Sequence, residues 1–237
     1  MDKAEQQKFF CEERYLPVRR FLDPALANLL KGYMEKKARM EQIHYAIDPD
    51  SQSHIFSGDL PGQDLQVQSS FAWYGDPMMD TLLEQSTAFI GDMIDKQLFP
   101  TYSYCRLYLN NAVLDKHIDR HECQFSTTIC LGGDPWPIFF EDKARNEIRI
   151  DLEPGDMVVY AGVELQHWRE PFTGSQCAQV FLHYGDVDFP MADPSDGRLA
   201  LGIPNRKVNK EYLENTLNEM EVRRNIIHRY LTGPDEN

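Results

Sequence analysis

The sequence predicts a mainly β protein with flanking helices, whose core is a jelly roll (a double-stranded β-helix) with a cavity between two antiparallel sheets. Between residues 102 and 184, short runs rich in aromatic and β-branched residues follow one another, as in CQFSTTICL. Turn residues such as Asn-Asn, Gly-Gly and Pro-Gly-Asp separate these runs. Strands this short and this evenly interrupted are typical of an antiparallel sandwich or barrel, and not of a parallel sheet with crossover helices.

The first core strand is expected at 102–109, where YSYCRLYL alternates aromatic and other residues and ends at an Asn-Asn turn. The later strands are shorter, and each is bounded by Gly, Pro or Asp. We expect them at 123–131, 136–140, 147–152, 157–160, 163–168 and 177–184.

Helical patterns lie outside this core. Asp23 and Pro24 form a helix-start signal, and Asp76 and Pro77 form another. Apolar residues recur at helical spacing after both signals and again near the end of the chain. We expect helices at 24–40, 76–94 and 209–231, of which the first two pack on the outside of the jelly roll.

The length and composition predict one domain. A chain of 237 residues with 42% hydrophobic content can bury a full core. We expect this single domain, 1–237, to have three parts. Residues 1–100 support the core and include a long Gly/Pro/Asp/Ser-rich loop at 48–66 that acts as a lid; 101–190 are the jelly roll, and 191–237 are an extension.

The composition also limits location and partners. No apolar run approaches the roughly 20 residues of a membrane helix, the first residues lack the apolar stretch of a signal peptide, and the five cysteines form no CxxC pair. These features predict a cytoplasmic protein without a membrane or disulfide framework. They leave the oligomeric state open.

The charge disfavours a phosphate-rich partner. The net charge is −14, whereas nucleic-acid binders rely on clusters of Lys and Arg. Between 47 and 100 nine acidic residues stand against one base, Lys96. If this segment borders a site, its acids favour a neutral or cationic small-molecule or peptidyl substrate; a general role in solubility explains them equally well.

Two histidines and an aspartate are the candidate metal ligands. His117 and Asp119 stand two residues apart, and His167 follows fifty residues after His117 in a strand-like run. Two imidazoles and one carboxylate bind one face of a ferrous ion and leave the opposite face open for oxygen and an organic co-substrate. A jelly roll brings the loop after one strand beside a distant strand, so we expect the three side chains to meet.

The stretch from about 102 to 184 resembles the core of the Fe(II)/2-oxoglutarate-dependent oxygenases, closest to the prolyl-4-hydroxylase-like branch. The residues that carry the resemblance are R-L-Y-x8-H-I-D, then P-G-D-M-V-V-Y, then H-W-R-E-P, in that order. The segment EERYLPVRRFLDPALANLL also resembles the strand-then-helix opening of that branch. The resemblance implies that His117, Asp119 and His167 hold Fe(II), with 2-oxoglutarate as co-substrate and O2 as oxidant.

The resemblance also suggests which residues bind 2-oxoglutarate. Tyr108 matches a family tyrosine that reaches the distal carboxylate, and Arg106 would share its strand face because strands have a period of two. The family's basic residue on the last core strand is missing, since 176–179 contain none. Arg169, two residues after His167, is the expected replacement because guanidinium pairs bidentately with carboxylate; pairing with Glu170 or a surface acid is the alternative. Thr128 is a further hydroxyl contact.

The implied activity is hydroxylation of an aliphatic C–H, of an amino-acid side chain that is free or in a peptide, as 2-oxoglutarate is converted to succinate and CO2. Two other classes stay open. A zinc-dependent hydrolase or lyase would use the same triad with a bound water. A jelly-roll binding protein without catalysis would also fit the missing basic residue.

Overall fold

The computed structural model describes residues 1–47, 58–189, 198 and 201–202. These fall within the first of two compact units of the chain, 1–204. The helix expected at 209–231 and positions 48–57 of the expected lid loop lie outside the described residues. No helix among the described residues is long and apolar enough to cross a membrane.

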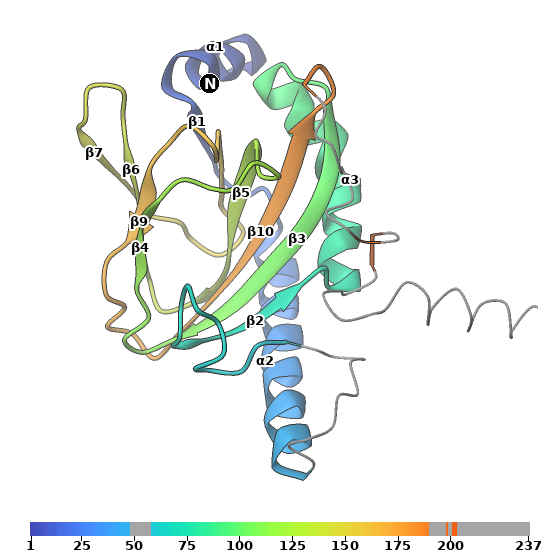
Figure 1. Ribbon diagram of the computed structural model, residues 1–237. Helices are drawn as coiled ribbons and strands as arrows, with labels where there is room; N and C mark the ends of the chain where they lie inside the picture. Colours follow the sequence, from blue (N-terminus) through green and yellow to red (C-terminus); the bar gives the residue numbers. More distant parts are fainter. Residues whose placement is uncertain (48–57, 190–197, 199–200, 203–237) are drawn as a thin grey trace, which may run out of the picture. The chain divides into compact units, whose positions relative to one another are not determined.

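Ten antiparallel strands form two sheets that face each other (Figure 1). The larger sheet has the order β1-β8-β5-β10-β3-β2 and the smaller one the order β4-β9-β6-β7. The strands of the larger sheet are β1 (Tyr15–Val18), β8 (Met157–Tyr160), β5 (Phe125–Gly133), β10 (Gln176–Asp186), β3 (Leu98–Leu109) and β2 (Ser70–Tyr74). Those of the smaller sheet are β4 (Leu114–His117), β9 (His167–Arg169), β6 (Ile138–Glu141) and β7 (Glu147–Ile150). The predicted jelly-roll class is confirmed.

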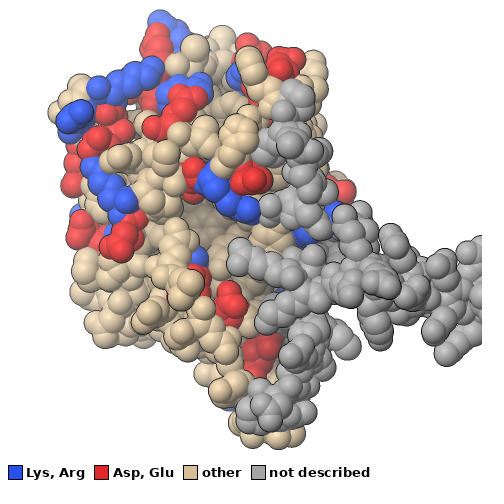
Figure 2. Space-filling model, in the orientation of Figure 1, with Lys and Arg blue, Asp and Glu red and all other residues tan. Residues whose placement is uncertain are grey.

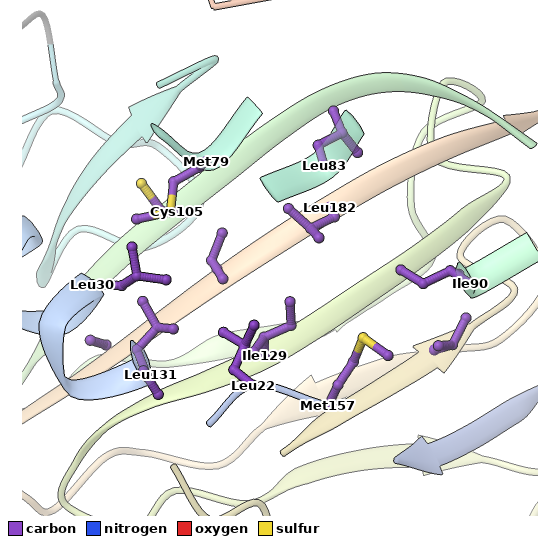
Figure 3. Close-up of a cluster of buried hydrophobic side chains, with 14 of the residues drawn as sticks. Leu22, Leu30, Met79, Leu83, Ile90, Cys105, Ile129, Leu131, Met157 and Leu182 are labelled. Carbon is purple, nitrogen blue, oxygen red and sulfur yellow. The ribbon is translucent and has the colours of Figure 1, made fainter. Parts of the chain in front are cut away.

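Two long helices cover the outer face of the larger sheet, α2 (Pro24–Ile47) and α3 (Pro77–Ile94), while α1 (Lys3–Glu13) lies at one end (Figure 1). Asp76 caps α3 by accepting hydrogen bonds from the two backbone amides that follow its Pro, as its position predicted. In the close-up of Figure 3, side chains from the helices interlock with those of β5, β8, β10 and β3. This apolar layer is the main core, and it leaves the inner face of the sheet free for other side chains.

Strand alternation decides which residues face inward. On β3, Cys105 and Leu107 belong to the helix-covered core, whereas Tyr108 packs with Trp136 and Leu114 between the two sheets. The same alternation on β5 and β10 turns polar side chains toward the smaller sheet, among them Ser126, Thr128, Gln179 and His183. The space between the sheets is therefore walled by buried polar and aromatic groups.

Several element boundaries differ from the expected ones. The strand expected at 163–168 is β9, 167–169, because the backbone amides of Glu164 and Leu165 both bond to the carbonyl of Ala161 in a turn. The first helix continues to Ile47, seven residues beyond the expected end at 40. Three elements were not predicted, namely α1, β2 and the short strand β4 that carries His117.

Candidate functional site

The structure brings the three expected metal ligands together at one end of the smaller sheet. His117 ends β4 and pairs in register with His167, which begins β9. Asp119 follows in the adjoining loop, with its Oδ1 3.5 Å from Nε2 of His167 and 3.7 Å from Nε2 of His117. One donor atom from each residue lies within 4.8 Å of the others. The set can therefore close around one ion.

Neighbouring groups orient each of these side chains. Nδ1 of His117 lies 2.7 Å from the carbonyl oxygen of Asp115, and Nδ1 of His167 lies 3.0 Å from that of Leu165. Since a carbonyl only accepts, both Nδ1 atoms carry a hydrogen, so in the neutral ring each Nε2 presents its lone pair to the centre. Such partners fix the tautomer and ring orientation of metal-binding histidines.

Asp119 is held in the same way from the larger sheet. The hydroxyl of Ser126 on β5 donates to Oδ2 of Asp119 at 2.7 Å, and the same hydroxyl lies 2.9 Å from Nδ1 of His183 on β10. Gly162 leaves room for this carboxylate, because a Cβ at that position would lie only 2.4 Å from Oδ2. The remaining oxygen, Oδ1, points to the two histidines.

The electrostatics keep these groups in their metal-binding forms. Burial lowers the pKa of His117, and the nearby His167 lowers it further, which favours the neutral imidazole. Burial alone would raise the pKa of Asp119, but His167, His183 and Ser126 together hold that pKa well below its ordinary value. A neutral His117 beside an ionised Asp119 is what a divalent cation requires.

Arg169 lies deeper between the sheets and is 1% exposed. Its guanidinium donates to the backbone carbonyl of Trp136 and, at 3.3 Å, to the hydroxyl of Thr128 across the cavity. Within 1–47 and 58–189, its Nε has no hydrogen-bond partner and no carboxylate forms an ion pair with the guanidinium. Glu170, the alternative partner considered above, instead accepts from the indole of Trp168. A buried cation without a counter-ion costs several kcal/mol, on the order of 3–5, so this site suits an anionic ligand.

Tyr108 adds a second unsatisfied group to this pocket. Its side chain is fully buried and its hydroxyl has no hydrogen-bond partner among the described residues. Its ring packs edge-on against Trp136, with 4.7 Å between the ring centroids, and the Arg169 guanidinium lies 5.0 Å from the centroid of the Trp136 ring. Buried polar groups normally have partners. Both groups lie beside the Trp136 indole, so a carboxylate bound there would be a partner for either of them.

Gln179 stands where the resemblance led us to look for a basic residue. It lies on the inner face of β10, and its side-chain oxygen accepts from Thr128 at 3.2 Å. The buried guanidinium on this side of the cavity belongs to Arg169 on the smaller sheet, and position 179 on β10 carries an amide instead of a cation.

Arg106 shares the inner face of β3 with Tyr108, as predicted, but its guanidinium is already engaged. One nitrogen, Nη2, donates to Asp64 at 2.6 Å and to the side-chain oxygen of Gln66 at 2.8 Å. The hydroxyl of Tyr104 also donates to Asp64, at 3.1 Å. The expected contact of Arg106 with the co-substrate stays a prediction: Nη2 is bound to Asp64, while Nε is buried without a hydrogen-bond partner among the described residues.

The acidic segment between 47 and 100 is not exposed throughout, because some of its carboxylates are buried in ion pairs. Asp64, Asp76 and Asp80 are each buried and paired with a cation: Arg106, Lys37 and Arg198 respectively. These three of the nine acids cannot form an acidic rim. Figure 2 shows a hollow on the face between the two sheets, with side chains of both charges around it.

Several contributors were not singled out from the sequence. Ser126, Gly162 and Gln66 bear on the ligands only through tertiary contacts, so no local pattern marks them. Trp136 packs with Tyr108, and its backbone carbonyl also accepts a hydrogen bond from Arg169. The alternation of β5 is the one signal that could have placed Ser126 on the same face as Thr128.

No protein-family model matches the sequence, and no curated protein matches it. Solved structures do match. A Pseudomonas putida prolyl-4-hydroxylase is 15% identical with a TM-score of 0.60, over 77% of this chain and 97% of that one. The 2-oxoglutarate-dependent carbocyclase SnoK from nogalamycin biosynthesis is 13% identical with a TM-score of 0.63, over 86% and 93%. HygX from Streptomyces hygroscopicus, solved with nickel and 2-oxoglutarate bound, is 10% identical with a TM-score of 0.58, over 78% and 87%. The fold is thus that of the prolyl-4-hydroxylase-like 2-oxoglutarate oxygenases, as the sequence motifs suggested.

Proposed function

We propose that this protein is an Fe(II)- and 2-oxoglutarate-dependent oxygenase that hydroxylates an aliphatic C–H of an amino-acid side chain, free or within a peptide. The observation that carries the proposal is the buried guanidinium of Arg169, which has no carboxylate partner in the described part of the chain and lies behind a two-histidine, one-carboxylate set. A dicarboxylic co-substrate satisfies both features at once, because one end reaches the metal and the other the guanidinium.

His117, Asp119 and His167 would hold Fe(II), whose open face takes 2-oxoglutarate and O2. When bound, the iron supplies oxygen activation: 2-oxoglutarate is decarboxylated to succinate and CO2, one oxygen atom enters succinate, and the other enters the substrate C–H bond. Arg169 and the Tyr108 hydroxyl would donate to the distal carboxylate, and Thr128, whose hydroxyl hydrogen is bound to Gln179, would hold the Arg169 guanidinium in place. The closely packed walls around Trp136 keep water away from this end of the cavity.

The substrate class rests on the matched structures and on charge. The Pseudomonas putida protein is a prolyl-4-hydroxylase, a Trichoplax adhaerens prolyl hydroxylase was solved with a peptide of hypoxia inducible factor, and HygX was solved with hygromycin B. A peptide or small molecule is therefore the class to screen. The net charge of −14 disfavours phosphate-rich substrates.

A zinc hydrolase or lyase built on the same triad is the second class to consider. Such an enzyme needs three ligands and a bound water. It provides no partner for the buried Arg169 guanidinium or for the Tyr108 hydroxyl, both of which lie beside the indole of Trp136. The co-substrate pocket therefore favours the oxygenase.

The test is succinate release from 2-oxoglutarate, with Fe(II) and air, during screening of amino acids and peptides. The wild type should release succinate, and Asp119→Ala should abolish the release because the metal loses its only carboxylate ligand. Asp151→Ala, which removes an exposed aspartate on a different loop, is the matched control and should behave as wild type. Equal succinate release by Asp119→Ala and the wild type would overturn the proposal.

A further inference from the structure

A chain of hydrogen bonds links the segment before β2 to the metal-facing side of His117. Arg106 donates to the side-chain oxygen of Gln66 at 2.8 Å, and the side-chain nitrogen of Gln66 lies 3.3 Å from Nε2 of His117. Nδ1 of His117 is bound to the carbonyl of Asp115 at 2.7 Å. Gln66 therefore touches the nitrogen atom that a metal would take.

The directions of these bonds are fixed by chemistry. A guanidinium only donates, so the oxygen of the Gln66 amide must face Arg106, and its NH2 group must face His117. The Asp115 carbonyl only accepts, so the hydrogen of His117 is on Nδ1 and Nε2 offers a lone pair. The Gln66 amide thus donates to the very lone pair that a metal ion would use.

The segment that carries Gln66 is anchored on both sides of it. Oδ1 of Asp64 accepts from the backbone amide of Gln66 at 2.8 Å, while Oδ2 accepts from Arg106 at 2.6 Å. Val67, on the other side, is 2% exposed and belongs to the same buried cluster as Tyr108 and Trp136, the residues beside the Arg169 guanidinium. Gln66 itself is exposed, so its amide can turn at the mouth of the site while its backbone stays in place.

We propose that Gln66 is a positioning residue that occupies Nε2 of His117 until a metal ion displaces it and then donates to an oxygen of the metal-bound 2-oxoglutarate. This inference rests on the proposed function. Arg106 and Asp64 form the anchor that keeps the Gln66 amide in reach, which gives Arg106 a structural role in this contact. The lone pair of His117 cannot serve amide and metal together, so a bound metal would release the Gln66 amide hydrogen, and an oxygen of the bound 2-oxoglutarate would be an available acceptor.

The test is calorimetric and needs no turnover. Nickel(II) is titrated into the full-length metal-free protein, and 2-oxoglutarate is then titrated into the nickel-loaded protein. Gln66→Ala removes the competing hydrogen bond, so nickel should bind about fivefold more tightly, the worth of one net hydrogen bond. The same variant loses the later contact, so 2-oxoglutarate should bind about fivefold more weakly.

Gln68→Ala is the matched control, because Gln68 is an exposed glutamine two positions along the same segment. It should leave both affinities unchanged. Gln66→Glu provides a second, larger change in the same direction, since a carboxylate beside His117 acts as an additional metal ligand and should tighten nickel binding well beyond the alanine variant.

If Gln66→Ala binds nickel as the wild type does, Gln66 does not compete with the metal for Nε2 of His117. If the variant binds 2-oxoglutarate as the wild type does, the Gln66 amide does not contact the bound co-substrate. These outcomes differ from a failure of the proposed function. If the wild type binds nickel but never binds 2-oxoglutarate, the oxygenase assignment itself is wrong.

Discussion

Replacing Arg169 with methionine tests the co-substrate pocket. The substitution removes the guanidinium from a position that is 1% exposed but keeps much of its volume. We expect the affinity of the metal-loaded protein for 2-oxoglutarate to fall sharply, because a buried, charge-assisted pair with the distal carboxylate is lost. Breaking a buried hydrogen-bonded charge pair costs roughly 2–4 kcal/mol, which corresponds to a loss of about thirty- to a thousandfold.

The ligand-free stability should respond differently. In the absence of ligand, the guanidinium is a buried charge whose hydrogen bonds to the described residues go to the Trp136 carbonyl and the Thr128 hydroxyl. Replacing it with an apolar side chain of similar size removes its desolvation cost, so Arg169→Met should unfold at the same temperature as the wild type or above it. A stability gain with an affinity loss is the signature of a binding residue, not of a core ion pair.

The assay is calorimetric titration with 2-oxoglutarate in the presence of nickel(II), together with thermal unfolding of the ligand-free protein. Arg149→Ala is the matched control, because Arg149 is an exposed arginine on the same sheet. The affinity of Arg169→Lys for 2-oxoglutarate should lie between those of the wild type and Arg169→Met, since an ammonium keeps the charge but cannot form the bidentate pair. The reasoning is refuted if Arg169→Met binds 2-oxoglutarate as the wild type does.

Three further predictions concern the metal ligands and the pocket. Gly162→Ala should weaken nickel binding at least tenfold, because the added Cβ would lie 2.4 Å from Oδ2 of Asp119. Gly32→Ala, where the added Cβ meets nothing within 4 Å, is the control and should bind nickel as the wild type does in the same calorimetric titration. Tyr108→Phe should leave the ligand-free stability unchanged or higher, because its hydroxyl has no hydrogen-bond partner in the described part of the chain, yet weaken 2-oxoglutarate binding about fivefold. Equal affinities of the variant and the wild type would remove Tyr108 from the pocket. Burial lowers the pKa of His117 below the ordinary value of about 6.5, so nickel should still bind near pH 6.5 and weaken as the pH falls further; an affinity that already declines above about pH 7 would contradict this.

The metal ligands could be predicted from sequence because their chemistry is concentrated in few residue types. Two of them stand two positions apart, and the third follows in a run of strand-forming residues. Period-two alternation also placed Arg106 and Tyr108 correctly on one face of β3. Such patterns can be read from the sequence because they depend only on residues that are close together in the chain.

The partners of these residues could not be predicted in the same way. Arg106 meets Asp64 from 42 positions earlier, and Arg169 meets the Trp136 carbonyl from 33 positions earlier. Nothing in the sequence near either arginine indicates which one has a counter-ion and which one lacks it. The helix α1 was missed for a different reason, since its sequence KAEQQKFFCEE is mostly polar and Phe10 is its one buried residue.

The central claim is tested most directly by titrating 2-oxoglutarate into the Fe(II)-loaded protein without oxygen. Chelation of ferrous iron by a 2-oxo acid produces a weak visible charge-transfer absorption. We predict that this absorption appears in the wild type and is lost in His167→Ala, which lacks one ligand of the set. An iron-loaded wild type that never develops the absorption would contradict the claim that these residues and the Arg169 pocket together bind iron and 2-oxoglutarate.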